Sequence, residues 1–102
     1  MTGMEDNLQL GGNIELSGFG SLDGGAMIIL KKIIGNYARK MSDKSKGFEG
    51  LKVSMKTVHD NKYELHAKLM DNGKAYVSSA VERNLFVAVD SALKKIMAET
   101  GK

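Results

Sequence analysis

The chain has 102 residues, of which 42% are hydrophobic and 26% charged, and its formal net charge is +3 at pH 7. This length predicts one domain, and this composition is typical of a folded globular protein rather than a disordered chain. Cysteine is absent, which excludes disulfides, thiolate metal sites and a cysteine nucleophile and fits a reducing cytoplasm. No run of about 18 apolar residues occurs, so we expect no membrane span and no membrane partner.

Residues 1–12 are polar and rich in glycine, and they lack the basic start and apolar centre of a signal peptide. We expect them to form a flexible tail ahead of a single domain at residues 13–102. Residues 13–19 (NIELSGF) alternate apolar and polar side chains, which predicts a strand with one buried face. In the glycine-rich stretch that follows, Ser21 or Asp23 can cap a helix.

A helix is predicted from residue 26 to about residue 41. Its expected buried stripe recurs at steps of three and four residues and consists of Ile29, Leu30, Ile33, Ile34, Tyr37 and Met41. Its polar side carries the basic residues Lys31, Lys32, Arg39 and Lys40, and the predicted helix contains no acidic residue. A solvated helix face usually mixes both signs. The pattern therefore indicates a basic stripe.

Residues 42–50 are a loop by composition, and three alternating runs at residues 51–58, 62–69 and 74–81 predict strands. Asp60-Asn61 and Asp71-Asn72-Gly73 lie between them as hairpin turns, and the second is the stronger signal because Asn-Gly readily accepts positive φ. A helix from residue 85 to about residue 99 follows, with Asn84 as its cap and Gly101 as its stop. Its expected inward residues are Leu85, Val89, Leu93, Ile96 and Met97.

The order of elements predicts the α+β class: a β-α-β-β-β-α two-layer sandwich, in which a four-stranded sheet carries both helices on one face. The other face of the sheet should then be open to solvent. We expect it to present Lys52, Lys56, Glu64, His66, Lys68, Tyr76 and Ser78. Lysines can neutralise phosphates and an aromatic ring can stack on a base, but lysine on an open sheet face is also an ordinary solvated residue. Lys94 and Lys95 likewise suit the end of a helix whether or not a ligand is present.

Residues for catalysis or metal binding are not evident. The two histidines, His59 and His66, lack the third ligand that a metal site needs, and no serine or carboxylate has an identifiable base partner. The stretch GFGSLDGG at residues 18–25 matches neither GxGxxG nor a Walker motif. We therefore expect no enzymatic activity, no metal, no cofactor and no small-molecule substrate.

The second half of the chain resembles the ribosome hibernation-promoting factor family, also called the ribosome-associated inhibitor or protein Y family. The resemblance rests on YELHAKLMDNGKAYVSSAVERNLFVAVDSALKKI at residues 63–96, where AVE closes a strand, FVAVD opens the last helix and Lys95 falls where the family typically has lysine. Asn84 stands where the family usually has aspartate, and both residues cap helices. The first half is similar in layout, so the likeness spans about residues 13–99.

The resemblance implies a cytoplasmic factor that binds rRNA in the mRNA and tRNA channel of the small ribosomal subunit and silences translation under stress. It implies binding through basic residues of the helices and the sheet edge. Longer members carry an extra dimerisation domain that we do not expect here, and we expect a monomer. The candidate RNA-binding residues are Lys31, Lys32, Arg39, Lys40, Lys52, Lys56, His66, Lys68, Tyr76, Lys94 and Lys95. The double-stranded-RNA-binding domain is a less similar relative, because the entry to the last helix offers only Arg83 as a cation. The alternative function is a protein-interaction or self-assembling domain without an RNA ligand.

Overall fold

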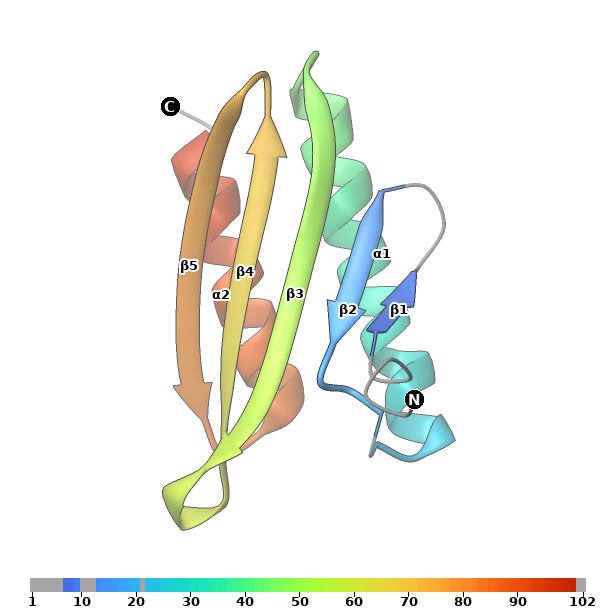
Figure 1. Cartoon of the computed structure of the whole chain (residues 1–102), viewed down its shortest axis with the longest axis vertical. Coiled ribbons are helices and arrows are strands. Elements are labelled where there is room, and N and C mark those ends of the chain that lie inside the picture. The colour runs from blue at the N-terminus through green and yellow to red at the C-terminus, as the bar shows by residue number, and fades with distance from the viewer. Residues whose placement is uncertain (1–6, 10–12, 21, 101–102) are drawn as a thin grey trace.

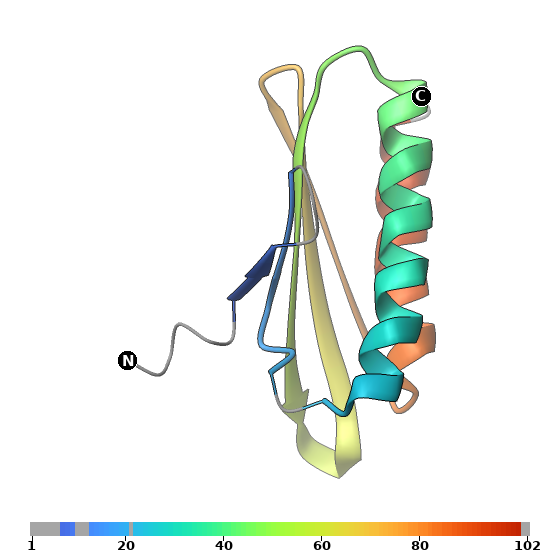
Figure 2. The same cartoon turned by 90° about the vertical axis from the view of Figure 1, so that its right-hand side faces the viewer.

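The chain folds into two layers, a five-stranded sheet and a pair of helices that cover one of its faces (Figures 1 and 2). This computed structural model describes residues 7–9, 13–20 and 22–100. Its elements are β1 (Asn7–Gln9), β2 (Ile14–Ser17), α1 (Gly24–Lys44), β3 (Phe48–Val58), β4 (Lys62–Asp71), β5 (Lys74–Glu82) and α2 (Leu85–Thr100). The predicted α+β sandwich with both helices on one face is confirmed.

The strands lie in the order β1-β2-β3-β4-β5. β2 and β3 are parallel and α1 connects them, whereas the other neighbours are antiparallel. The fifth strand was not expected: residues 7–9 pair with β2 instead of belonging to a flexible tail, and Leu8 lies opposite Leu16. This pairing satisfies backbone groups that an edge strand β2 would leave unpaired. The other residues of the predicted tail, 1–6 and 10–12, lie outside the described residues.

Helix α1 is longer than predicted at both ends. The Asp23 carboxylate accepts a hydrogen bond from the Ala26 amide at 2.7 Å, which confirms this cap and starts the helix at Gly24. Ser21, the other predicted cap, lies outside the described residues. Leu30, Ile34 and Met41 of the predicted stripe are buried, and Ile33 and Tyr37 are half-buried against the core. Ile29 is instead 46% exposed, and Ala38 is buried although it was not predicted to be.

Helix α2 follows the prediction closely. The Asn84 side-chain oxygen accepts hydrogen bonds from the Phe86 and Val87 amides at 2.9 and 3.1 Å, which confirms the cap. Four of the five expected inward residues are buried and Met97 is half-buried, whereas Gly101 lies outside the described residues. The core between helices and sheet includes Leu16, Leu30, Ile34, Met41, Leu51, Val53, Leu65, Leu69, Val89, Leu93 and Ile96.

The two hairpins set the register of the central strands. In the β4–β5 turn Asn72 and Gly73 have φ of 53° and 80°, as the Asn-Gly signal predicts, and Asp71 lies opposite Lys74. A 3-10 turn, His59–Asn61, joins β3 to β4. β3 begins at Phe48, three residues before the predicted start, because its first residues pair with the end of β4 across an irregular register.

Candidate nucleic-acid interface

The outer surface of α1 is basic along most of its length. Each predicted cation of this helix, Lys31, Lys32, Arg39 and Lys40, is exposed. No acidic residue occurs between residues 24 and 42, but the helix extends far enough to add Asp43 and Lys44, which the predicted boundary left out. Lysine and arginine on one solvent-facing surface are the residues that neutralise phosphates. We use the name helical surface for five exposed cations, which are Lys31, Lys32, Arg39 and Lys40 of α1 and Lys94 of α2.

A hydrogen bond between the helices fixes their relative position. The Tyr37 hydroxyl donates to the Asp90 carboxylate at 2.6 Å. Burial of the hydroxyl, followed by its hydrogen bond to Asp90 and the negative charge of that carboxylate, raises the pKa of Tyr37 to about 12. Tyr37 therefore stays a neutral donor at every physiological pH.

This contact determines which cations approach one another. Lys40 lies one turn after Tyr37, and its Nζ is 5.6 Å from the centroid of the tyrosine ring. Lys94 lies one turn after Asp90. α1 and α2 run in the same direction (Figures 1 and 2), so Lys40 and Lys94 each lie one turn beyond the Tyr37–Asp90 contact, toward the same end of the helix pair. The structure thus brings Lys94 toward the basic residues of α1.

Lys95 is placed differently from its neighbour. Its Nζ donates to the backbone carbonyl of Ser79 at 2.8 Å, so its side chain reaches over the sheet at β5. β5 is an edge strand, and a lysine that occupies an edge carbonyl protects that carbonyl from pairing with another strand. The structure therefore gives Lys95 a structural partner within the chain.

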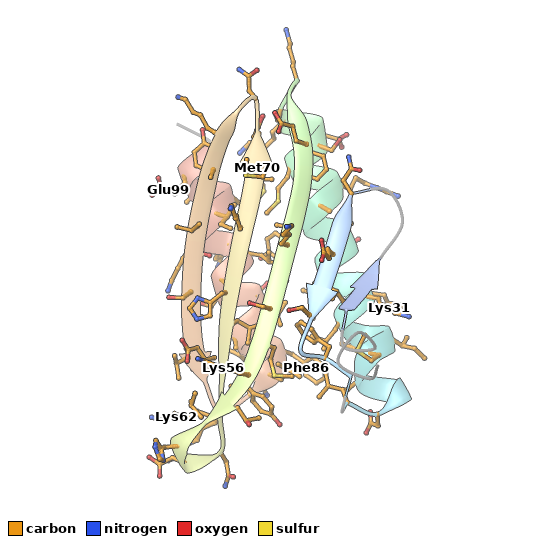
Figure 3. The ribbon with its side chains drawn as sticks, viewed as in Figure 1. Lys31, Lys56, Lys62, Met70, Phe86 and Glu99 are labelled. Carbon is orange, nitrogen blue, oxygen red and sulfur yellow. The ribbon has the colours of Figure 1, made fainter. Side chains whose placement is uncertain are left out.

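The open face of the sheet presents four of the predicted site residues. Lys52 and Lys56 of β3 and His66 and Lys68 of β4 are all exposed. Figure 3 shows this face with its side chains, among which Lys56 is labelled. Two carboxylates accompany them: Glu15 lies 4.0 Å from Lys52, and Glu64 lies 2.6 Å from the Nε2 of His66. The cations of this face are therefore interleaved with acids, unlike those of α1.

The predicted position of Tyr76 on this face is wrong. The register places Tyr76 opposite Leu69 and Ser78 opposite Ala67, so both side chains lie on the side covered by the helices. Tyr76 packs against the core, and the Ser78 hydroxyl donates to the Ala92 carbonyl at 2.6 Å. Val77, which is 69% exposed, and Ser79 take the outward positions instead.

The two-residue Asn-Gly turn contained the signal for this register. Such a turn pairs the residues that flank it, here Asp71 with Lys74, and every further pair follows by counting outward. Counting from this pair places Tyr76 beside Leu69, a core residue. Alternation within β5 alone cannot identify the inner face, because each of its two residue sets contains both polar and apolar side chains.

The predicted cations lie on two opposite faces of the molecule. The side view shows α1 and α2 on one side of the sheet, and the open face turns away from them (Figure 2). Lys31, Lys32, Arg39, Lys40 and Lys94 belong to the helical surface, whereas the β3 and β4 cations belong to the open face. This division follows from the predicted sandwich, in which the helices cover one face of the sheet and the β3 and β4 cations lie on the other.

A shallow groove of about 400 Å³ occupies the open face. Its lining includes Glu15, Ser17, Lys52, Ser54, His66 and Lys68. Ser17 and Ser54 were not among the predicted site residues, and nothing in their sequence context distinguishes them from solvated strand residues.

The described residues contain neither a cluster of metal-ligating side chains nor a helix that could span a membrane. No three side chains of histidine, cysteine, aspartate or glutamate lie together in a way that could hold a metal ion there. Within the same part of the chain, neither α1 nor α2 has a window apolar enough to cross a membrane.

No protein-family model matches this chain, and no curated protein matches it.

Proposed function

We propose that this protein is a non-catalytic RNA-binding factor that binds rRNA of the small ribosomal subunit through its helical surface and silences translation. The observation that carries the proposal is the basic surface of α1, which has no acidic residue between residues 24 and 42; Lys94 lies beside it together with Asp90, whose carboxylate is bound by Tyr37. The likeness of residues 63–96 to the hibernation-promoting factors supports the choice of target. A cytoplasmic location belongs to the same proposal.

The helical surface suits RNA better than it suits a protein partner. Lys32 and Arg39 lie about two turns apart on the same side of α1, without an acid between them, and can contact phosphates of one strand. Tyr76 is turned inward, so it supplies no stacking platform for a base on the opposite face. We therefore expect recognition of backbone shape and charge more than of base sequence.

Co-sedimentation with purified small subunits tests the proposal directly. The protein should co-sediment at low salt and dissociate as salt rises, with log K falling by about 0.7–0.9 per phosphate contacted. The double variant Lys32→Gln, Arg39→Gln should weaken binding. It should also reduce the slope of log K against log salt by the amount that corresponds to about one to two phosphate contacts. Absence of co-sedimentation at every salt concentration would contradict the proposal.

A matched control separates a local effect from the loss of net charge. Lys46 and Lys74 are exposed, and neither belongs to the helical surface. The double variant Lys46→Gln, Lys74→Gln lowers the net charge by the same amount and should bind like wild type. Equal weakening by both double variants would mean that binding follows total charge and has no defined site.

The alternative, self-assembly, is favoured by one specific feature. β5 has no strand on its outer side among the described residues, and its Val77 and Val81 are 69% and 49% exposed. Antiparallel pairing of two copies centred on Ser78 would place Lys74 opposite Glu82 of the second copy and would require Lys95 to release the Ser79 carbonyl. Light scattering at micromolar to millimolar concentration tests self-assembly. A salt-insensitive dimer that the Val77→Lys substitution dissociates would support it, and a monomer at every concentration would contradict it.

A further inference from the structure

The groove on the open face has a physical cause in the register of the sheet. Residues that lie side by side across β2, β3 and β4 form rows, and successive rows on one face are about 7 Å apart. One row contains Ser17, Ser54 and His66, and the row beside it contains Glu15, Lys52 and Lys68. Short serine side chains next to long lysines leave a trough with basic walls.

Lys52 and Lys68 face each other directly across β3 and β4. Side chains in such a pair have Cβ atoms about 5 Å apart, and like charges at this position destabilise a sheet. Glu15 offsets the charge of Lys52 at 4.0 Å. Lys68 has no carboxylate within 4.0 Å in the part of the chain that the structure describes, so its charge is available to a ligand.

The floor of the groove offers hydrogen-bond donors that have no partner among the described residues. The hydroxyls of Ser17 and Ser54 make no hydrogen bond with any described residue. His66 belongs to the same row. Its Nε2 lies 2.6 Å from the Glu64 carboxylate, and this contact fixes the ring beside the serines. Hydroxyl donors beside two ammonium groups are what a phosphate ester requires from a binding site.

The carboxylates at the borders distinguish a small ligand from a nucleic-acid strand. Glu15 lies in the row of the lysines, and Glu64 lies in the row on the other side of the serines. An RNA backbone that crossed the face would carry phosphates toward these carboxylates, whereas a single phosphoryl group fits between them. Glu15 can then accept a hydrogen bond from a hydroxyl of the same ligand.

We propose that this groove binds the phosphomonoester group of a small hydroxylated molecule, such as a sugar phosphate or a nucleotide. Lys52 and Lys68 supply the counter-charges, and the hydroxyls of Ser17 and Ser54 donate to the phosphoryl oxygens. The groove volume of about 400 Å³ falls within the range of small-molecule sites. This site is independent of the helical surface, which lies on the other side of the sheet.

An NMR titration of the full chain tests the proposal with four probes at constant ionic strength: inorganic phosphate, ribose 5-phosphate, AMP and a short RNA. The expected result is a saturable shift of the Ser54, His66 and Lys68 signals with both phosphomonoesters, and a weaker effect with inorganic phosphate. Shifts at these residues with RNA alone would overturn the proposal and assign the groove to an RNA interface. If none of the four probes causes saturable shifts, the proposal is overturned as well.

Variants locate the site. Lys68→Gln should weaken ribose 5-phosphate binding by about tenfold, and Ser54→Ala by a smaller factor. Lys74→Gln removes the same charge outside the groove and should leave the affinity unchanged, which controls for general electrostatics. The double variant Lys32→Gln, Arg39→Gln should also bind the sugar phosphate like wild type, so failure of the RNA proposal and failure of this one are distinguishable. Equal affinity of the Lys68→Gln and wild-type proteins would contradict the site.

Discussion

Gly18, the residue directly after β2, has a position that only glycine can occupy without strain. Its φ is +83°, and a Cβ atom added there would lie 2.2 Å from the backbone carbonyl oxygen of Met55 in β3. Gly35 in α1 is the opposite case, because a Cβ there meets no atom within 4 Å. The same residue type thus has a required position in the sheet and a dispensable one in the helix.

Substitution of these two glycines by alanine should change stability in opposite directions. Gly18→Ala should lower the free energy of unfolding by at least about 2 kcal/mol, since backbone strain and a clash with immovable backbone add together. Gly35→Ala should raise it by about 1 kcal/mol, the difference in helix propensity. Urea unfolding followed by circular dichroism measures both, and a neutral Gly18→Ala would contradict the close approach of β2 to β3.

At the scale of elements, the contact between α1 and α2 depends on a tyrosine that must remain protonated. An unfolded tyrosine ionises with a pKa of about 10, whereas Tyr37 in the folded protein ionises at about 12 because of burial and the Asp90 carboxylate. The folded state therefore holds this proton more tightly than the unfolded state. The stabilisation that protonated Tyr37 gives the folded state is complete below pH 10 and is lost as the pH rises toward 12.

Tyr37→Phe should remove this pH dependence. At pH 7 the variant should be less stable by about 1 kcal/mol, the usual net contribution of one hydrogen bond. The difference from wild type should shrink between pH 10 and pH 12, because only the wild type loses the contribution of the hydroxyl there. Asp90→Asn keeps an acceptor but removes the charge, so its loss of stability in this pH range should be smaller than that of wild type. Urea titrations at intervals of half a pH unit measure these differences. If the free energy of unfolding of all three proteins changes with pH in parallel, the Tyr37–Asp90 contact is absent.

At the scale of the whole molecule, a sheet separates two basic surfaces of different character. The helical surface carries cations without acids between residues 24 and 42, and the open face carries cations interleaved with Glu15 and Glu64. Two faces of one sandwich can hold two ligands at once, since neither ligand covers the other site.

Binding at the two surfaces should therefore be independent. Saturating ribose 5-phosphate should leave the midpoint of the salt-dependent dissociation from the small subunit unchanged, apart from its contribution to ionic strength. Potassium chloride at matched ionic strength is the control. Displacement of the protein by ribose 5-phosphate beyond that control would mean that both ligands share one surface or that the surfaces are coupled.

Local patterns in the sequence predict most of the elements, because helix caps, apolar periodicity and Asn-Gly turns act over a few residues. The Asp23 and Asn84 caps and the apolar stripe of α2 are examples that the structure confirms. The strand β1 was missed, since three residues contain no periodicity and their pairing depends on the edge that β2 offers. Tyr76 lies on the face opposite to the predicted one, because the face depends on the register between strands, which alternation within β5 does not specify.

Patterns along the chain are enough to predict the class of fold, the order of helices and strands after residue 13, the positive charge of α1 and the separation of its cations from those of β3 and β4. The folded chain is needed to show that the register turns Tyr76 inward, that Lys95 is bound to the edge of β5, and that serines and lysines of β2, β3 and β4 line one groove. The physical reason is that charge and periodicity belong to single segments. A surface, in contrast, is made by the register between strands that are distant in the chain and by the side of the sheet on which the helices pack.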